Sequence, residues 1–153
     1  MNKIRLRPAV LNDLPTLYEF EQEIVVTERP FDPTLKTDHI HYYDLKAMIL
    51  AAKTEVIVAV MDNEIVGSAY VSIRKAETFQ KHNLYAYFGF MYVKPECRGM
   101  GIIQKIIEEL KSWAQARGLN EIRLEVYEEN LPAISAYEKA GFKKHLAEMR
   151  VEI

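Results

Sequence analysis

The sequence predicts one α/β domain with a mixed sheet whose two faces are covered by helices. The first half carries a strand, a helix and then two apolar strands joined as a hairpin. In the second half, strands and amphipathic helices alternate. A chain in which a hairpin is followed by alternating strands and helices is typical of a sheet that packs helices on its faces. A chain of 153 residues can bury its own core, so we expect a single domain over residues 1–153.

The N-terminal elements come from two different periodicities. Residues 3–9, "KIRLRPA", alternate apolar and polar side chains and predict a strand. Residues 11–24, "LNDLPTLYEFEQEI", repeat apolar residues at helical spacing and predict a helix capped by Asn12. Residues 27–44 contain two prolines and little periodicity, which favours a long shaped loop of the kind that often carries function.

The middle of the chain predicts one short helix and three strands. Asp44 can cap a helix over residues 45–52. Two apolar strands follow in residues 55–75, joined at Asp62–Asn63 as a hairpin. Residues 84–93, "LYAYFGFMYV", predict a further strand.

The last third alternates between helix and strand. Residues 101–118 predict a helix that ends near Gly118 and has one apolar face, made of Ile103, Ile106, Ile107, Leu110 and Trp113. Residues 121–129 predict a strand, and residues 130–141 a helix capped by Asn130. Residues 142–153 predict a last strand.

Composition excludes several classes of function. With 20 basic and 22 acidic side chains the net charge is −2, which gives no electrostatic footprint for nucleic acid. No run approaches the ~20 apolar residues of a membrane span, and the N-terminus lacks an apolar signal core. We therefore expect a cytoplasmic protein without a membrane partner. His39 and His41 would face the same side of an extended segment, but no third ligand supports a metal site.

The stretch "VKPECRGMGII", residues 93–103, places two glycines at the start of an apolar helix. Backbone N–H groups at a helix N-terminus have no partner within the helix and attract phosphate, and glycines let a phosphate approach closely. A plain turn into the helix is the simpler explanation of the glycines alone. A P-loop is excluded, because Ile102 follows Gly101 where that motif needs Lys. A Rossmann fingerprint lacks its third small residue at Gln104.

From Met91 through Phe142 the sequence resembles the GCN5-related N-acetyltransferase (GNAT) superfamily. Its coenzyme-A turn reads Gln or Arg, two residues, Gly, one residue, Gly or Ala, and here Arg98, Gly101 and Ile103 fill these three positions. The flanking "VKPE" and "EVYEENLPAISAYEKAGF" resemble the family's usual surroundings. The resemblance implies a central, mostly antiparallel sheet with helices on both faces, acetyl-CoA as co-substrate and no metal.

The resemblance also implies which residues bind the coenzyme. The pyrophosphate turn would comprise Arg98, Gly99, Met100, Gly101, Ile102 and Ile103, and the pantetheine arm would pair with the main chain of Met91, Tyr92 and Val93. Asn130 would contact the pantetheine amides. Ile103 departs from the family's small residue, and we expect its side chain to turn toward the core.

Two residues are candidates for the chemistry. Tyr137 follows Asn130 by seven residues on the same helical face, about 10 Å along the axis. The resemblance makes it the acid that protonates the coenzyme-A sulfur, against the alternative of an ordinary half-buried aromatic residue. Glu125 resembles the base of protein N-terminal acetyltransferases, although alternation along a strand would equally place an outward carboxylate there. Cys97 adjoins the helix start, but direct transfer needs no acyl-cysteine.

We expect the acceptor pocket in the long loop and beside the strand before the turn. Its candidate residues are Glu28, Arg29, Phe31, Tyr42 and Tyr87, which would either orient a small amine or pack the loop. The sequence hypothesis is an acetyl-CoA-dependent N-acetyltransferase that acts directly on a small-molecule primary amine. The alternatives are a protein N-terminal or lysine acetyltransferase and a non-catalytic acyl-CoA sensor. Members of the superfamily are often dimers, so a homodimer stays open.

Overall fold

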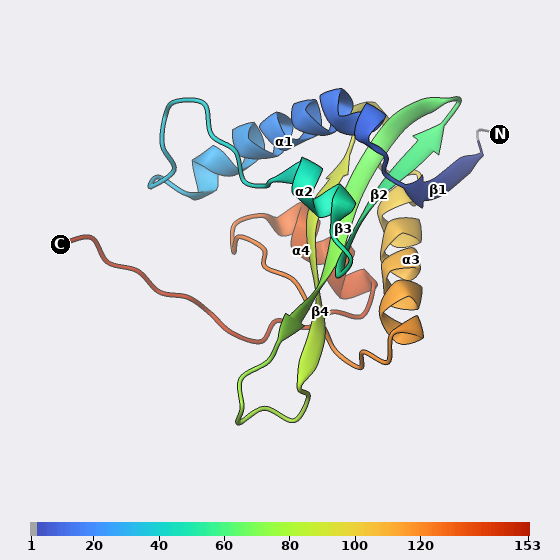
Figure 1. Ribbon diagram of the computed structural model, residues 1–153. Helices are drawn as coiled ribbons and strands as arrows, with labels where there is room; N and C mark the ends of the chain where they lie inside the picture. Colours follow the sequence, from blue (N-terminus) through green and yellow to red (C-terminus); the bar gives the residue numbers. More distant parts are fainter. Residues whose placement is uncertain (1–2) are drawn as a thin grey trace.

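The computed structural model describes residues 3–153 and contains one five-stranded sheet in the order β1-β2-β3-β4-β5 (Figure 1). The strands are β1 Ile4–Pro8, β2 Thr54–Met61, β3 Glu64–Lys75, β4 Leu84–Val93 and β5 Ile122–Arg123. The α-helices are α1 Leu14–Glu28, α2 Leu45–Leu50, α3 Ile102–Ala116 and α4 Leu131–Lys139, with short 3-10 turns at Leu11–Asp13, Arg29–Phe31 and Pro95–Cys97. Neighbouring strands run antiparallel from β1 to β4, whereas β4 and β5 are parallel. The predicted mostly antiparallel α/β sheet is confirmed.

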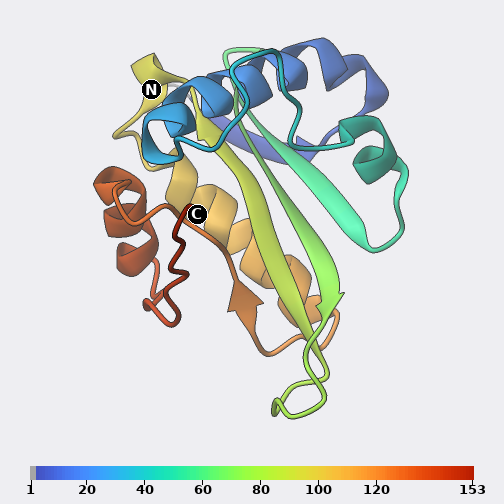
Figure 2. The same cartoon turned by 90° about the vertical axis from the view of Figure 1, so that its left-hand side faces the viewer.

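Two apolar cores lie on opposite faces of the sheet (Figures 1 and 2). On one face α3 contributes Ile106, Ile107, Leu110 and Trp113, and α4 packs Tyr137 against the same core. On the other face α1 contributes Leu17 and Phe20, and α2 contributes Leu45. Each helix therefore buries one stripe against the sheet, as its apolar periodicity predicted.

Two local predictions are confirmed in detail. Asp62 and Asn63 join β2 to β3 with φ angles of 51° and 66°, and this left-handed pair matches the twist of a tight hairpin. The Asp44 carboxylate accepts a hydrogen bond from the Ala47 N–H at 3.1 Å and caps α2.

The start of α1 differs from the prediction. Asn12 does not cap the helix, because it lies inside the 3-10 turn Leu11–Asp13 that runs directly into α1. The Asp13 carboxylate instead accepts hydrogen bonds from the Val10 N–H at 2.8 Å and from the Arg7 guanidinium at 2.7 Å. The helix also continues further than expected, so Glu28 ends α1 rather than lying in the loop.

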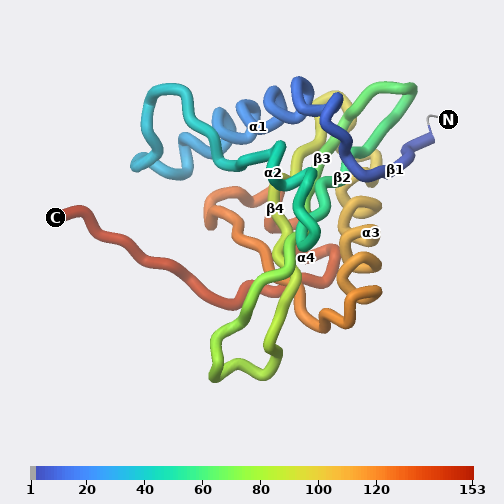
Figure 3. The backbone as a smooth tube through the Cα atoms, viewed as in Figure 1, coloured from blue at the N-terminus to red at the C-terminus, as the bar shows by residue number. Residues whose placement is uncertain are grey.

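The predicted strands at 121–129 and 142–153 are largely wrong. Only Ile122 and Arg123 pair with β4, and residues 142–153 form no strand. The C-terminal segment extends away from α4, with Leu146, Met149, Val151 and Ile153 almost fully exposed (Figure 3). Alternation supplies the side chains of a strand, but a strand also needs a neighbour to accept its hydrogen bonds, and periodicity does not specify one.

None of the helices in residues 3–153 combines the length and apolar character needed to cross a membrane.

Candidate functional site

A β-bulge in β4 shapes the centre of the molecule. Because Tyr70 pairs with Gly89 and Ser68 with Tyr92, β3 places Ala69 alone opposite two residues of β4, Phe90 and Met91. Phe90 has a φ of 54°, and its carbonyl accepts a buried hydrogen bond from the Ser68 hydroxyl at 3.0 Å. A bulge bends its strand and re-aims the side chains that follow.

The bulge separates a paired half of β4 from an open half. Strand β5 pairs with Ala86 and Tyr87 only, so within the described residues no strand lies beside β4 from Phe88 onward on that side. The open edge includes Met91 to Val93, the residues predicted to pair with pantetheine. An unpaired strand edge offers main-chain N–H and C=O groups to an extended ligand.

The predicted pyrophosphate turn follows this edge and leads into α3. Arg98 donates from its Nε to the Val93 carbonyl at 3.1 Å, which ties the turn to the end of β4. Gly99 and Gly101 have φ angles of 77° and 78°, a region that glycine alone enters without strain. Space around both is open, since a Cβ on either would meet nothing within 4 Å. No side chain in residues 3–153 caps the first N–H groups of α3, which leaves them available to an anion.

Ile102 and Ile103 begin α3 on the core side. Ile102 is fully buried, whereas Ile103 is partly buried and packs against the same core. The apolar face of α3 therefore starts one residue earlier than predicted, at Ile102. The expectation that Ile103 turns toward the core is confirmed by its packing.

Asn130 and Tyr137 lie at the two ends of α4. The Asn130 side chain accepts a hydrogen bond from the Ala133 N–H at 3.4 Å, so it caps the helix. Tyr137 is half-buried, and its ring packs at 6.0 Å from that of Phe142. Burial raises the pKa of the Tyr137 hydroxyl to about 12, and the nearby Glu28 and Tyr87 add to the shift. Its hydroxyl is therefore protonated at neutral pH.

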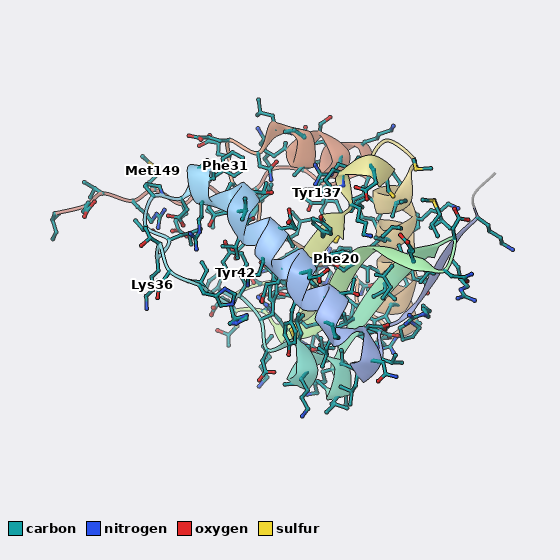
Figure 4. The ribbon with its side chains drawn as sticks, turned by 90° about the horizontal axis from the view of Figure 1, so that it is seen from above. Phe20, Phe31, Lys36, Tyr42, Tyr137 and Met149 are labelled. Carbon is teal, nitrogen blue, oxygen red and sulfur yellow. The ribbon has the colours of Figure 1, made fainter. Side chains whose placement is uncertain are left out.

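Glu28 lies near both Tyr137 and the long loop that follows α1. The residue ends α1, and burial raises the pKa of its carboxyl group. Burial and the neighbouring Glu28 carboxylate together raise the pKa of Tyr42, whose hydroxyl is buried. Figure 4 shows Tyr137 between α4 and α1, with Tyr42 and Phe31 near α1. Glu28 thus lies near both Tyr42 and Tyr137.

The other predicted acceptor residues have different surroundings. The Arg29 guanidinium donates to the carbonyls of Thr37 at 3.0 Å and Asp38 at 2.7 Å, so it holds the loop. Phe31 packs against Tyr127 with ring centroids 6.0 Å apart. Tyr87 lies under the Arg74 guanidinium at 3.6 Å.

Glu125 is exposed and lies beyond the end of β5, not within a strand as predicted. Its charge contributes to raising the pKa of Tyr87 to about 12, after the larger effect of burial. The carboxylate therefore lies close to Tyr87, one of the predicted acceptor residues.

Asp32 lies in the same long loop, and three segments meet at its carboxylate. It accepts hydrogen bonds from the Thr34 N–H at 2.9 Å, the Tyr127 hydroxyl at 3.1 Å and the Arg150 guanidinium at 3.0 Å. These bonds, led by those from Thr34, hold the pKa of Asp32 well below its usual range. Only the turn Asp32–Thr34 has a local sequence signal; Tyr127 and Arg150 are distant in sequence.

The two histidines lie together, as predicted, with Nε2 atoms 3.1 Å apart. Residues 3–153 contain no group of three or more His, Cys, Asp or Glu side chains arranged to hold a metal ion. Cys97 is buried and free.

Comparisons with known proteins agree with this geometry. Streptothricin acetyltransferase of Escherichia coli is 37% identical over 84 residues, 55% of this chain and 44% of that protein. Thialysine N-epsilon-acetyltransferase of Sus scrofa is 40% identical over 55 residues, 36% of this chain and 32% of that protein. The chain thus matches less than half the length of these curated relatives.

The structure of a predicted acetyltransferase with acetyl-CoA from Clostridium acetobutylicum superposes with a TM-score of 0.76, at 20% identity, over 98% of this chain and 96% of that one. This likeness shows a shared fold. The sequence model of the acetyltransferase (GNAT) family matches residues 15–142, most of the chain. The chain therefore belongs to the GNAT acetyltransferase family.

Proposed function

We propose that this protein is an acetyl-CoA-dependent N-acetyltransferase that passes the acetyl group directly to a primary amine of a small molecule. The observation that carries the proposal is the open edge of β4, which leads through a glycine turn to the uncapped start of α3. Tyr137 packs against the same apolar core as Met91, and its pKa is raised to about 12.

Main-chain groups would bind the co-substrate. The N–H groups from Arg98 to Ile103 would hold the pyrophosphate, and the edge of Met91 to Val93 would pair with the pantetheine arm. The N–H of Met91 would face the acetyl carbonyl and stabilise the negative charge that develops on its oxygen. Asn130 caps α4 through its side-chain oxygen, so its amide N–H groups are the part that would meet the pantetheine.

Tyr137 would supply the proton that the leaving group needs. The amine nitrogen attacks the thioester carbon, the C–N bond forms, and the C–S bond breaks with its electron pair on sulfur. The Tyr137 hydroxyl then donates its proton to the thiolate, and it regains a proton from the amine or from solvent. A phenol with a pKa near 12 remains protonated until the moment of transfer.

The amine must be neutral to attack. An alkylamine with a pKa near 10.4 is neutral about one time in 2,500 at pH 7, a cost of about 4.6 kcal/mol. Glu125 is the proposed base for this proton, and its proximity to Tyr87 supports that role. Glu28 would bind the incoming cation, and the buried Tyr42 hydroxyl beside it would orient it.

The acidic and aromatic lining favours a small cationic amine as acceptor. Glu28 and Glu125 supply negative charge, while Tyr42 and Tyr87 supply flat surfaces that attract cations. The relatives from Escherichia coli and Sus scrofa are named for streptothricin and thialysine. Their names support a small-molecule amine over a protein N-terminus.

An acceptor screen tests the proposal. The purified protein is incubated with acetyl-CoA and a panel of diamines, amino acids, aminoglycosides and peptides, and products are identified by mass spectrometry. We expect acetylated small amines and an equal amount of free thiol. Acetylated peptides alone would favour a protein acetyltransferase. Acetyl-CoA binding without any product would favour a sensor and overturn the proposal.

A further inference from the structure

Helix α1 carries a buried carboxylate that the proposed chemistry does not use. Glu21 has a relative exposure of 0%, although it is ionisable and lies on the apolar stripe of α1 between Leu17 and Val25. A buried carboxylate is costly unless hydrogen-bond donors surround it. The hydrogen-bond partners of Glu21 therefore indicate its role.

All three donors to Glu21 come from one short stretch of the loop between α1 and α2. Its Oε2 accepts the N–H groups of Tyr42 at 3.0 Å and Tyr43 at 2.9 Å. Its Oε1 lies 2.7 Å from His41 Nδ1, and His41 Nε2 in turn contacts His39. The carboxylate therefore fixes three consecutive loop residues from inside the helix, by bonds that are strong because one partner is charged.

Two further contacts extend this attachment along α1. Gln22 donates to the Ile40 carbonyl at 2.9 Å, and Arg29 donates to the Thr37 carbonyl at 3.0 Å. Because the helix residue number rises as the loop residue number falls, the loop runs back antiparallel along α1. Figures 1 and 3 show the loop passing beyond the end of α1 and returning beside it. Glu21 holds the returning end, at Tyr42 and Tyr43.

Because the backbone is fixed at Tyr42 and Tyr43, their two side chains point in different directions. The Tyr43 ring enters the core, with centroids 5.2 Å from Phe90 and 5.7 Å from Tyr70. The Tyr42 hydroxyl is buried on the acceptor side, where the Glu28 charge raises its pKa. If Glu21 no longer held this stretch of the loop, Tyr42 would lose its position, whereas none of these hydrogen bonds involves the turn before α3.

We propose that Glu21 is a positioning residue that sets acceptor affinity by locking the loop at Tyr42 and Tyr43. This inference rests on the proposed acetyltransfer to an amine, since it assigns the loop to the acceptor. Glu21 does not touch the acceptor; it acts through the backbone and through His41. Its direct hydrogen bonds end at residues 41–43 and none reaches the turn before α3, so we expect its main effect on the acceptor.

The test compares Glu21→Gln with Glu23→Gln, an exposed glutamate on the same helix. Gln keeps the size of the side chain but removes its charge and turns one acceptor oxygen into a donor, which faces either the Tyr42 and Tyr43 N–H groups or His41 Nδ1. We expect the acceptor KM to rise about tenfold in Glu21→Gln, with kcat and the Kd for acetyl-CoA within about twofold of Glu23→Gln. Equal KM values for the two variants, or a parallel rise in KM and in the Kd for acetyl-CoA, would overturn the proposal.

A second pair of variants leaves the buried position intact. His41 is half exposed, so its replacement should not prevent folding. His41→Ala removes the donor to Glu21, and we expect a smaller rise in acceptor KM. His41→Asn places an amide N–H near the position of Nδ1 and should restore the wild-type KM. Failure of Asn to rescue, with Ala raising the KM, would show that His41 does not act through Glu21.

Amide hydrogen exchange separates this inference from the proposed function. In the wild type, the Tyr42 and Tyr43 amides should be protected, and Glu21→Gln should lose that protection while α3 keeps its own. This measurement needs no acceptor, so it still decides the anchoring role if no amine is acetylated. Unchanged protection at Tyr42 and Tyr43 would overturn the anchor whatever the outcome of the activity assay.

Discussion

The proposed coenzyme half and the proposed acceptor half of the site differ in the groups that form them. The coenzyme half is main chain from one continuous stretch, residues 91–103, shaped by a bulge, two left-handed glycines and a helix start. The acceptor half consists of side chains from the end of α1, the following loop, the segment after β5 and the C-terminal segment. Main-chain geometry follows from local sequence, whereas a set of converging side chains depends on the whole fold. Substitutions in the two halves should therefore change different constants.

The largest expected effect is at the junction of the two halves. Tyr137→Phe removes only the phenolic hydroxyl group, and we expect kcat to fall by about 10² to 10⁴ with the Kd for acetyl-CoA unchanged. Tyr18→Phe, an exposed tyrosine on α1, is the control and should retain activity. Steady-state thiol release checks both variants. Full turnover by Tyr137→Phe would remove this residue from the chemistry.

On the acceptor side, Glu125→Gln removes the proposed base. We expect kcat/KM to fall about a hundredfold at pH 7 and much less at pH 9, where more of the amine is already neutral. Glu128→Gln, an exposed neighbour, is the matched control. The measurement is the pH dependence of kcat/KM. A profile identical to the wild type in Glu125→Gln would show that the carboxylate is only an outward surface charge.

On the coenzyme side, Gly101→Ala and Gly118→Ala form a matched pair at the two ends of α3. Both glycines have positive φ, 78° and 71°, and open space around a Cβ. Each substitution should lower the free energy of unfolding by about 1–2 kcal/mol through backbone strain. Only Gly101→Ala should weaken acetyl-CoA binding. We expect its Kd for acetyl-CoA to rise about tenfold, because the added methyl group would meet the phosphates. Calorimetric titration checks this, and equal Kd values would contradict a phosphate site at this turn.

The smallest expected effect concerns the carboxylate that joins three acceptor-side segments. The folded-state pKa of Asp32 is lowered by Thr34 and Arg150, so its ionised form stabilises the fold above its unfolded pKa of about 3.9. That contribution is lost as the pH falls through and below this value. The free energy of unfolding of Asp32→Asn should therefore fall less than that of the wild type as the pH is lowered. Urea unfolding between pH 2 and 6 measures this difference. The control is Asp38→Asn, which is exposed. If the free energy of unfolding depended on pH in the same way in Asp32→Asn and in the wild type, Asp32 would not be a source of the loss of stability in acid.

The local structure around the proposed coenzyme half could be predicted from the sequence more fully than that around the proposed acceptor half, for a physical reason. The glycine turn, the hairpin at Asp62–Asn63 and the apolar face of α3 each depend on neighbours within a few residues. The bulge at Phe90 depends instead on how β3 and β4 pair, which alternation in one strand does not encode.

The acceptor half had weaker signals, and one was overlooked. Glu21 lies on an apolar stripe, where a charged residue indicates a buried partner, but the sequence does not say which loop residues reach it. Asp32 and Tyr127 are 95 residues apart, so only the tertiary structure brings them together. The last strand, at residues 142–153, failed because its alternation had no partner strand.

The most direct test of direct transfer is thiol release from one equivalent of acetyl-CoA, followed before and after an accepted amine is added. Cys97 is buried, so no acyl-enzyme should form, and thiol should stay at background until the amine arrives. It should then appear in step with acetylated amine. A full equivalent of thiol before the amine, together with an acetyl adduct on the protein, would contradict direct transfer.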